Sequence, residues 1–225
     1  CEHAGSAIPQ GWNNLGLGDE FLETHFACDL GARALAFDLA SRLGSPLIAA
    51  RYSRLYFDIN RHPGDWERIR PDMGGIPIPG NENLSPVDHD LRDRIARAPF
   101  DALVQSELAH HRYLVSIHSF SPIYNGRTRK TDIGVLHFDD CPLGATLIET
   151  LRATPGLKVG SNEPYDMRSA PPGTIHRLIP DRRMDAVALE VRNDLLADVR
   201  GIARIAGILA DALGPIGDEG ARADV

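Results

Sequence analysis

The stretch "YLVSIHSFSP", residues 113–122, decides which fold this chain is expected to adopt. Residues 113–117 form a short run that is mostly apolar and rich in β-prone side chains, which is typical of a buried strand. His118 stands where this run ends. A strand of this kind delivers an imidazole to the end of a β-sheet, where ligands commonly bind.

Similar apolar runs alternate with segments of helical periodicity along the rest of the chain. Strands are expected at residues 46–61 (two extended pieces joined by a turn), 113–120, 133–138, within 157–165 and at 185–192, and the first ten residues resemble the end of a strand. Helices are expected after Gly18, at 29–44, at 85–111 with Pro99 as a candidate break, at 141–156, and at 195–214 with Gly214 closing the helix. Residues 62–86, rich in Pro, Gly and Asn, are expected to form a long functional loop.

This alternation predicts an α/β fold whose largely parallel sheet is covered by helices on both faces. A chain of 225 residues is long enough for a complete core, so residues 1–225 are expected to form a single domain. In such sheets ligands bind beyond the carboxyl ends of the strands. Five polar residues lie at or just past predicted strand ends: His118, Asn60, Arg61, Glu190 and Arg192.

The composition is that of a soluble globular protein, with 43% hydrophobic and 24% charged residues. The net charge of −7 gives no electrostatic support for nucleic-acid binding, and no apolar run approaches the ~20 residues of a membrane span. Cys1, Cys28 and Cys141 fit no zinc or CxxC spacing, which favours reduced thiols in the cytoplasm. No signal peptide is visible, although a sequence that starts at Cys1 without Met leaves the N-terminus open.

His3 and His118 each lie at an expected junction of strand and loop, and together they indicate a metal site. Neutral imidazole is the usual nitrogen ligand of Zn²⁺, and catalytic zinc commonly binds two histidines and one carboxylate. Asp29 and Glu2 both qualify as the carboxylate. Asp29 is expected to begin a helix, where an acid also complements the helix dipole. Glu2 is adjacent to His3, and neighbouring side chains on a strand point to opposite faces.

Glu190 alternates with the apolar Leu189 and Val191 on an expected strand, so its side chain is expected to point to the opposite face. Two roles fit this position. Glu190 qualifies as a general base that removes a proton from a metal-activated water, or as an ion-pair partner of Arg192.

Arginines gather in two segments of the chain. Residues 53–61 (SRLYFDINR) hold Arg54 and Arg61 together with Asn60. Arginine suits the bidentate binding of a carboxylate, and a surface ion-pair cluster is the alternative. A second polar segment follows the strand that ends at His118, with Tyr124, Asn125 and Arg129. A cationic rim on an acidic chain favours small anionic ligands over polyanions.

Three short segments that contain these candidate residues resemble segments of zinc carboxypeptidases of the mixed α/β type. "SIHSFSP" is similar to the strand-end histidine segment that supplies that family's last zinc ligand, and "FDINR" to its Asn-Arg pair, which holds a substrate carboxylate. "LEVRND" is similar to the segment whose glutamate is the catalytic base. The chain departs from that family at its first motif, because Ser6 stands where the family has a glutamate three residues after the first histidine.

A closer resemblance covers nearly the whole chain. Seven phrases in order, "CEHAG…IP", "HFACDLGARALA", "YSRLYFDINR", "SIHSFSP", "NGRTRKTDIGVL", "NEPY" and "EVRNDLL", are similar to the N-formylglutamate amidohydrolase family. This family shares its broad fold with the zinc carboxypeptidases and the zinc-dependent muramoyl-alanine amidases. The resemblance implies a three-layer α/β/α sandwich, a role in histidine degradation, and one zinc ion held by His3, Asp29 and His118, with Asp29 preferred over Glu2.

These residues, taken together with the resemblance, lead us to expect the following mechanism. Glu190 removes a proton from water that attacks an amide carbonyl and then protonates the leaving nitrogen. Arg54 stabilises the developing oxyanion, and Arg61, with Asn60 and Arg192, binds the substrate carboxylate. The remaining substrate-binding candidates are Tyr124, Asn125, Arg129 and His176, the last from the phrase "GTIHRL".

The expected substrate is a small anionic N-acyl amino acid, in the first place N-formyl-L-glutamate, which would give formate and L-glutamate. One alternative is a zinc amidase or carboxypeptidase-type enzyme that acts on another N-acyl amino acid or on a peptide. A second alternative is a catalytically inactive homologue that only binds metal or ligand. Zinc is the expected ion, other divalent metals could share these ligands, and the oligomeric state is left open.

Overall fold

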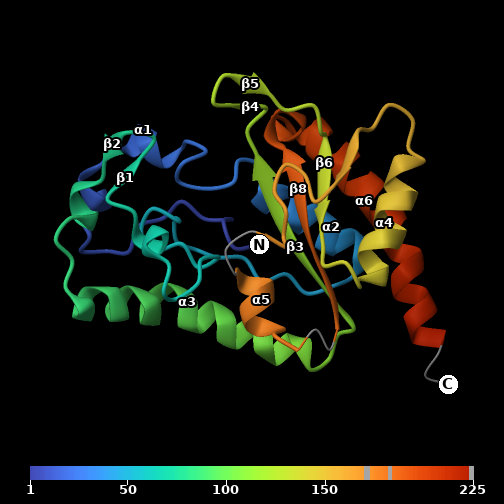
Figure 1. Cartoon of the computed structure of the whole chain (residues 1–225), viewed down its shortest axis with the longest axis horizontal. Coiled ribbons are helices and arrows are strands. Elements are labelled where there is room, and N and C mark those ends of the chain that lie inside the picture. Colours follow the sequence, from blue (N-terminus) through green and yellow to red (C-terminus); the bar gives the residue numbers. More distant parts are fainter. Residues whose placement is uncertain (170–172, 182–183, 223–225) are drawn as a thin grey trace.

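The computed structural model of this chain describes residues 1–169, 173–181 and 184–222. Its α-helices are α1 (Asp19–Leu22), α2 (Ala32–Leu43), α3 (Pro86–Leu108), α4 (Pro142–Arg152), α5 (Thr174–Leu178) and α6 (Val199–Arg222) (Figure 1). Short 3-10 turns lie at Asn13–Gly16, Trp66–Ile69, Pro79–Asn81 and Asn193–Leu196. None of the helices in these ranges has the length and apolar character that crossing a membrane requires.

A four-stranded sheet forms the centre of the molecule, with the strand order β3-β8-β6-β7 (Figure 1). Its strands are β3 (Tyr113–Phe120), β6 (Ile133–Leu136), β7 (Val159–Ser161) and β8 (Asp185–Arg192). β3 runs parallel to β8 and β6 parallel to β7, whereas β6 and β8 are antiparallel. Two small hairpins are formed by β1 (Asp72–Met73) with β2 (Ile76–Pro77), and by β4 (Ile123–Tyr124) with β5 (Arg127–Thr128). The mostly parallel, mixed sheet that the sequence predicts is confirmed.

Alternating side chains on β8 divide the core into two layers. Val187, Leu189 and Val191 pack with the buried residues of α2, α4 and α6 on one face of the sheet. Ala186 and Ala188 pack on the other face, against α3, α5 and the long connections of the N-terminal half. The helices therefore cover both faces of the sheet, as Figure 1 shows, and the α/β fold expected from the sequence is confirmed.

The second face of the sheet carries polar side chains toward the strand ends. Glu190 follows Ala188 on this face, and its register partner on β3 is His118. Because paired residues in a sheet project side by side, the two side chains leave the sheet as neighbours. The small residues Ala186 and Ala188 leave room on this face for the segments that cover it.

The expected strands within residues 46–61 are wrong. The segment forms one isolated bridge, from Tyr52 to Ala7, and then a series of turns, in which Tyr56 N–H donates to the Ser53 carbonyl at 3.0 Å. Leu55, Tyr56, Phe57 and Ile59 of this segment are nevertheless buried against the second face of the sheet. The apolar run therefore indicated burial correctly and extended structure incorrectly, because short buried runs do not distinguish strands from packed turns. The first ten residues likewise form no strand.

Three helix boundaries differ from those expected. α2 begins at Ala32 rather than at Asp29, although it ends at Gly44 as predicted. α3 begins after Ser85, one of the two caps that the sequence offers, and Asp88 completes a capping box with it. The helix continues through Pro99, which is exposed, so that water can reach the carbonyl that the proline leaves unbonded. α6 extends beyond Gly214 to Arg222. The three cysteines are free thiols, as expected.

Arg92, on α3, is fully buried and joins the N-terminal half to this helix. Its Nη1 donates to the Tyr56 carbonyl at 2.9 Å and to Asn81 Oδ1 at 2.6 Å, and its Nη2 donates to the Gly80 carbonyl at 2.5 Å. The guanidinium also packs over the ring of Trp12, 4.4 Å from its centroid. Burial lowers the pKa of Arg92 to about 10, so the side chain remains charged at neutral pH.

We expect Arg92→Met to destabilise the protein by about 3 kcal/mol, because the backbone acceptors would be left buried without a donor. Methionine keeps much of the side-chain volume, so the decrease in the free energy of unfolding would come from the lost hydrogen bonds and not from a cavity. Urea unfolding measures the free energy of unfolding of the variant. Arg94→Met, on the exposed side of α3, is the matched control. Equal stability of the two variants would contradict this role of Arg92.

Candidate metal centre and active site

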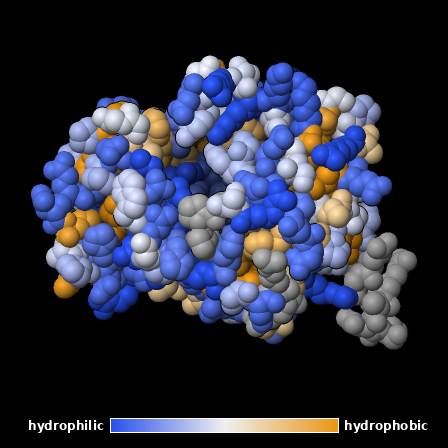
Figure 2. Space-filling view, viewed as in Figure 1, coloured by the Kyte–Doolittle hydropathy of each residue, from blue (hydrophilic) through white to orange (hydrophobic). Residues whose placement is uncertain are grey.

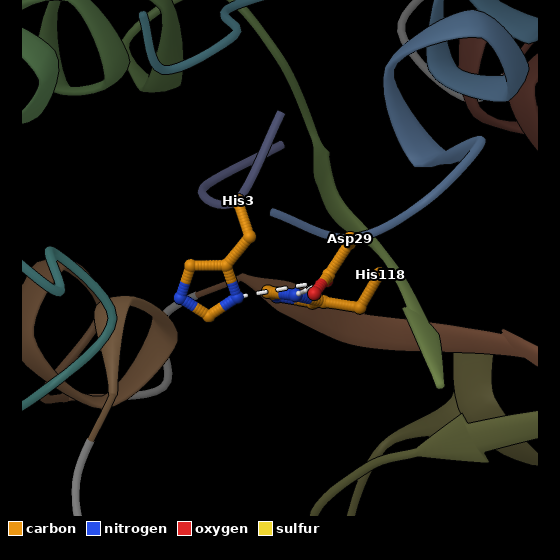
Figure 3. Close-up of side chains that lie close together, drawn as sticks. All are labelled: His3, Asp29 and His118. Carbon is orange, nitrogen blue, oxygen red and sulfur yellow. Dashed lines mark hydrogen bonds and ion pairs between the residues drawn. The ribbon is translucent and has the colours of Figure 1, made fainter. Parts of the chain in front are cut away.

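His3, Asp29 and His118 converge from three separate segments. His3 lies in the N-terminal loop, Asp29 in the segment that leads into α2, and His118 in β3 (Figure 3). All three are buried, and one candidate ligand atom from each lies within 4.8 Å of the others. Asp29 Oδ2 is 2.9 Å from His118 Nδ1 and 3.5 Å from His3 Nδ1. Two imidazole nitrogens and a carboxylate oxygen thus face a common point, a donor set that suits Zn²⁺.

Hydrogen bonds donated by backbone N–H groups hold the three segments together. The Asp29 N–H donates to the His3 carbonyl at 2.9 Å, and the Ser119 N–H donates to Asp29 Oδ2 at 3.2 Å. Gly31 then turns the chain into α2 with a φ of 79°, and a Cβ at Gly31 would lie 2.5 Å from Leu196 Cβ. Glycine is required at this turn for both reasons, and the turn fixes the direction of Asp29 relative to β3.

Each histidine is held at its outer nitrogen by a second carboxylate. His3 Nε2 is 2.8 Å from Asp58 Oδ1, and His118 Nε2 is 3.3 Å from Glu2 Oε2, which also accepts from Ser116 Oγ at 2.6 Å. Carboxylates at the outer nitrogen are characteristic of metal-binding histidines, because they fix the ring orientation and the tautomer. The geometry therefore presents Nδ1 of both rings toward Asp29.

The protonation of these groups follows from their burial and neighbours. Burial, helped by the charge of Arg54, lowers the pKa of His3 to about 4, so this imidazole is neutral at pH 7. Burial alone would lower the pKa of His118, but the hydrogen bond and charge of Glu2 outweigh it and raise the pKa. Burial would raise the pKa of Asp58, yet the charge and hydrogen bond of His3 lower it.

The two acids that the sequence left open occupy different places. Asp29 lies between the two imidazoles, whereas Glu2 lies on the outer side of His118. Asp58, in the segment SRLYFDINR, is a site residue to which the sequence assigned no role. It lies 55 positions from His3, and only the close packing of the two segments brings them together, so no spacing along the chain signals their contact.

Glu190 lies on β8 beside this cluster, with His118 as its neighbour on β3 and Gly134 as its neighbour on β6. It is buried, and its carboxyl group makes no hydrogen bond to another residue in the described ranges. Burial raises the pKa of Glu190, and the charges of His118 and Arg54 oppose this effect only in part. A raised pKa brings a carboxyl group closer to the range that suits general acid–base catalysis at neutral pH.

The two arginines of residues 53–61, Arg54 and Arg61, form ion pairs with acidic side chains. Arg54 Nη2 donates to Asp29 Oδ1, while its buried Nε has no partner within the described ranges. Arg61 Nη2 lies 3.1 Å from Glu67 Oε2, and two aspartates lie within 4 Å of the same guanidinium. Asn60 Oδ1 accepts from the Thr174 N–H at 2.8 Å, which positions the start of α5.

Arg192 and His176 also have structural partners. Arg192 pairs with Asp132 at 2.8 Å and with Asp194 at 2.7 Å, at the end of β8. His176 Nδ1 accepts from the Gly173 N–H at 3.2 Å, and its ring packs edge-on against Phe138. The structure therefore does not bring these two side chains into contact with the His3, Asp29 and His118 cluster.

The remaining predicted residues belong to the β4–β5 hairpin. Asn125 has a φ of 48° and Gly126 a φ of 73°, as the tight Asn-Gly turn of a hairpin requires. Tyr124 is exposed, and Arg129 packs against its ring with 4.5 Å between guanidinium and centroid. Figure 2 shows a hollow with hydrophilic walls between this hairpin and the part of the molecule that carries α1, β1 and β2.

The comparison with family models assigns the chain to one family. The model of the family described as N-formylglutamate amidohydrolase matches residues 1–197. The crystal structure of gene product Atu2144 from Agrobacterium tumefaciens is 34% identical, with 96% of this chain and 89% of that chain covered and a TM-score of 0.86. A structure of N-formylglutamate amidohydrolase from Ralstonia eutropha JMP134 shares the fold at 20% identity, with 99% and 93% covered and a TM-score of 0.70. The search of curated proteins gives no match.

We expect Asp58→Asn to weaken zinc binding roughly 10- to 100-fold, because the carboxylate that orients His3 would be replaced by a neutral amide. Competition with a chromogenic chelator measures the zinc affinity. Asp38→Asn on α2, where the acid pairs with Arg42, is the matched control and should leave the affinity unchanged. An unchanged affinity in Asp58→Asn would show that Asp58 does not support the site.

Proposed function

Because the chain belongs to the N-formylglutamate amidohydrolase family, an amide-hydrolysing family, we propose that it converts N-formyl-L-glutamate into formate and L-glutamate. The observation that carries this proposal is the convergence of His3, Asp29 and His118 beside the buried Glu190. Hydrolysis of an unactivated amide needs an activated water and a group that protonates the leaving nitrogen. This cluster offers residues for both tasks.

His3, Asp29 and His118 are the proposed ligands of one Zn²⁺ ion, and other divalent ions could share them. Four carboxyl groups are buried around the two histidines, those of Glu2, Asp29, Asp58 and Glu190. The positive charges next to them are fewer, because His3 is neutral and only Arg54, paired with Asp29, and His118, whose pKa is raised, can balance these acids. The surplus of buried acids fits a cation, because burying carboxylates without compensating charge is costly. Bound zinc would supply a Lewis acid that polarises the amide carbonyl and makes water acidic enough to ionise near pH ~7.

Glu190 is the proposed general base. Its carboxylate takes a proton from the attacking water and later gives that proton to the departing amide nitrogen, so the carboxyl group returns to its starting state. The pKa of Glu190, raised by burial, supports both steps, because a less acidic carboxyl group holds the proton better between them. Its place next to His118 across the β3–β8 pair supports the proximity that this role demands.

Arg54 is the proposed source of positive charge for the oxyanion that develops on the carbonyl oxygen. Its pairing with Asp29 supports a location beside the cluster, and its unpartnered Nε leaves one donor unused within the described ranges. Removing a donor of this kind typically costs about 3–4 kcal/mol of transition-state stabilisation. Arg54 would then orient Asp29 and stabilise the transition state with the same guanidinium.

Asn60, Arg61, Arg192, Tyr124, Asn125, Arg129 and His176 remain the proposed substrate-binding residues. The side-chain nitrogen of Asn60 is available for a ligand, because its Thr174 contact uses only the oxygen. Arg61 would have to exchange a neighbouring acid, such as Glu67, for a substrate carboxylate. A cytoplasmic location, expected from the thiol pattern, also stays a prediction.

We expect the purified chain loaded with zinc to hydrolyse N-formyl-L-glutamate faster than formimino-, acetyl- or other formyl-amino acids. A panel assay of these compounds, with metal analysis of the same preparation, measures this. Preference for an acetylated amino acid or a peptide would assign the site to another amidase. Full metal content without turnover of any compound would assign it to a binding protein.

We expect Glu190→Gln to keep its zinc and to lose about 10²- to 10⁴-fold in kcat, because the amide cannot accept the proton from water. Steady-state kinetics and metal analysis test the two halves of this prediction. Glu107→Gln, at a partly exposed position near the end of α3, is the control and should retain full activity. Persistent activity in Glu190→Gln would place the base elsewhere.

We expect kcat/KM to fall in acid with a limb above pH 4.5, the ordinary pKa of a glutamate, because burial raises the pKa of Glu190 and only its ionised form accepts a proton. The activity should therefore rise with pH through this pKa. Zinc content measured at each pH separates this limb from loss of metal at protonated histidines. A limb at or below pH 4.5 with zinc retained would contradict the assignment.

A further inference from the structure

Arg129 is held in an unusual way for a charged side chain. It follows β5, and its N–H donates to the Pro122 carbonyl at 2.8 Å, which closes the base of the β4–β5 hairpin. The guanidinium lies between three rings, 5.4 Å from the centroid of Phe120, 4.5 Å from that of Tyr124 and 5.1 Å from that of Tyr165. Aromatic faces attract a cation and hold its plane in a fixed orientation.

No carboxylate among the described residues lies within 4 Å of this guanidinium, in contrast to the other arginines proposed for the site. Arg54 is paired with Asp29, Arg61 with Glu67, and Arg192 with Asp132. Of the five N–H donors of Arg129, one reaches Tyr165 Oη at 3.3 Å. Most of its hydrogen-bonding fork is therefore left for a ligand.

The position of Arg129 fits a substrate bound at the proposed metal centre. Phe120 follows His118 by two positions on β3, so both side chains leave the same face of the sheet, about 7 Å apart. Arg129 covers Phe120, and its charge is close enough to Glu190 to oppose the effect of burial on that pKa. Figure 1 shows the β4–β5 hairpin beyond the ends of β3 and β8, on the side where the strands deliver these residues.

Tyr165 completes this subsite. Because its hydroxyl oxygen accepts from Arg129 Nη1, the hydroxyl hydrogen is left to donate to a ligand. The ring is partly exposed, with 43% of its surface accessible. A planar fork and a hydroxyl beside it together offer the donors that a carboxylate accepts.

We propose that Arg129, oriented by Phe120, Tyr124 and Tyr165, is the specificity-determining residue that receives a carboxylate of the acyl amino acid, with Tyr165 as a second donor. This inference rests on the proposed function, since it assigns the recognition of the anionic substrate at that same site. Arg61, which three acids surround, is then a secondary contact of the substrate carboxylate rather than its first partner. The rings reduce the cost of binding, because they hold the guanidinium in place before the ligand arrives.

Steady-state kinetics of Arg129→Gln test the proposal with three compounds. N-formyl-L-glutamate carries both carboxylates, N-formyl-L-glutamine lacks the side-chain carboxylate, and N-formyl-L-isoglutamine lacks the α-carboxylate. We expect KM for N-formyl-L-glutamate to rise roughly 10- to 100-fold with little change in kcat, because a charged hydrogen bond made before and during reaction is lost. The substitution should have almost no effect on the amide that lacks the carboxylate bound by Arg129, which identifies that carboxylate.

Two further variants separate recognition from structure. Arg127→Gln changes an exposed arginine of the same hairpin and should leave KM unchanged. Tyr165→Phe keeps the ring under the guanidinium but removes the hydroxyl, and we expect a smaller rise in KM for N-formyl-L-glutamate. An equal rise in KM for all three compounds in Arg129→Gln, or a fall in its kcat with KM unchanged, would overturn the proposal.

A binding measurement keeps the proposal testable if the proposed function fails. Calorimetry with glutarate, a dicarboxylate without an amide, is carried out on the zinc-loaded wild type, Arg127→Gln and Arg129→Gln. Glutarate binding that is lost only in Arg129→Gln would support the subsite even if no N-formyl amino acid is hydrolysed. Hydrolysis of N-formyl-L-glutamate at an unchanged KM in Arg129→Gln would overturn the subsite and leave the function standing. Absence of glutarate binding in a wild type that is also inactive would overturn both.

Discussion

The contact of Asp29 Oδ2 with Nδ1 of both His3 and His118 is the constraint on which the rest of the site depends. It requires the N-terminal loop, the turn before α2 and the end of β3 to meet within hydrogen-bond distance. The fold meets this requirement with a left-handed turn at Gly31 and with a hydrogen bond from the Ser119 N–H to Asp29, which joins residues 90 positions apart. A shift of any one segment would move one ligand atom away from the others, so the stability of these connections and the integrity of the site are linked.

Electrostatics explain why the cluster is held so tightly. Carboxyl groups are costly to bury unless each has a partner, and here Asp58 faces His3 while Glu2 faces His118 and Ser116. These pairings orient the rings and leave their inner nitrogens directed toward Asp29. Glu190 is the exception among the buried acids, since it has no hydrogen-bond partner in the described part of the chain. An unpartnered, buried carboxyl group beside a candidate metal site is a candidate for proton transfer.

The fold followed from the sequence where side chains repeat with a clear period. On β8 the alternation of apolar residues with Ala188 and Glu190 predicted both the strand and the face from which Glu190 leaves it. The start of α3 was also expected at Ser85, where a side chain that can cap a helix precedes the periodic segment. The segment 46–61 failed because its apolar residues are buried in turns, and burial alone does not specify backbone conformation. The helix ends at Asp29 and Gly214 were misplaced because tertiary packing overrides local end signals.

By itself the sequence determined the residue types of the site. These are two histidines, a choice of acids and a set of arginines near strand ends, and they could be found because single residues and short sequence motifs identify the chemical groups that such a site needs. Only the tertiary structure decided that Asp29 rather than Glu2 lies between the imidazoles, that Asp58 supports His3, and that the Arg129 guanidinium faces rings while Arg61 faces acids. The reason is physical. His3, Asp29, Asp58 and His118 lie 26 to 115 positions apart along the chain and become neighbours only when the layers pack. The partners that Arg61 and Arg129 contact in the folded chain decide whether each guanidinium supports the fold or is available to a ligand.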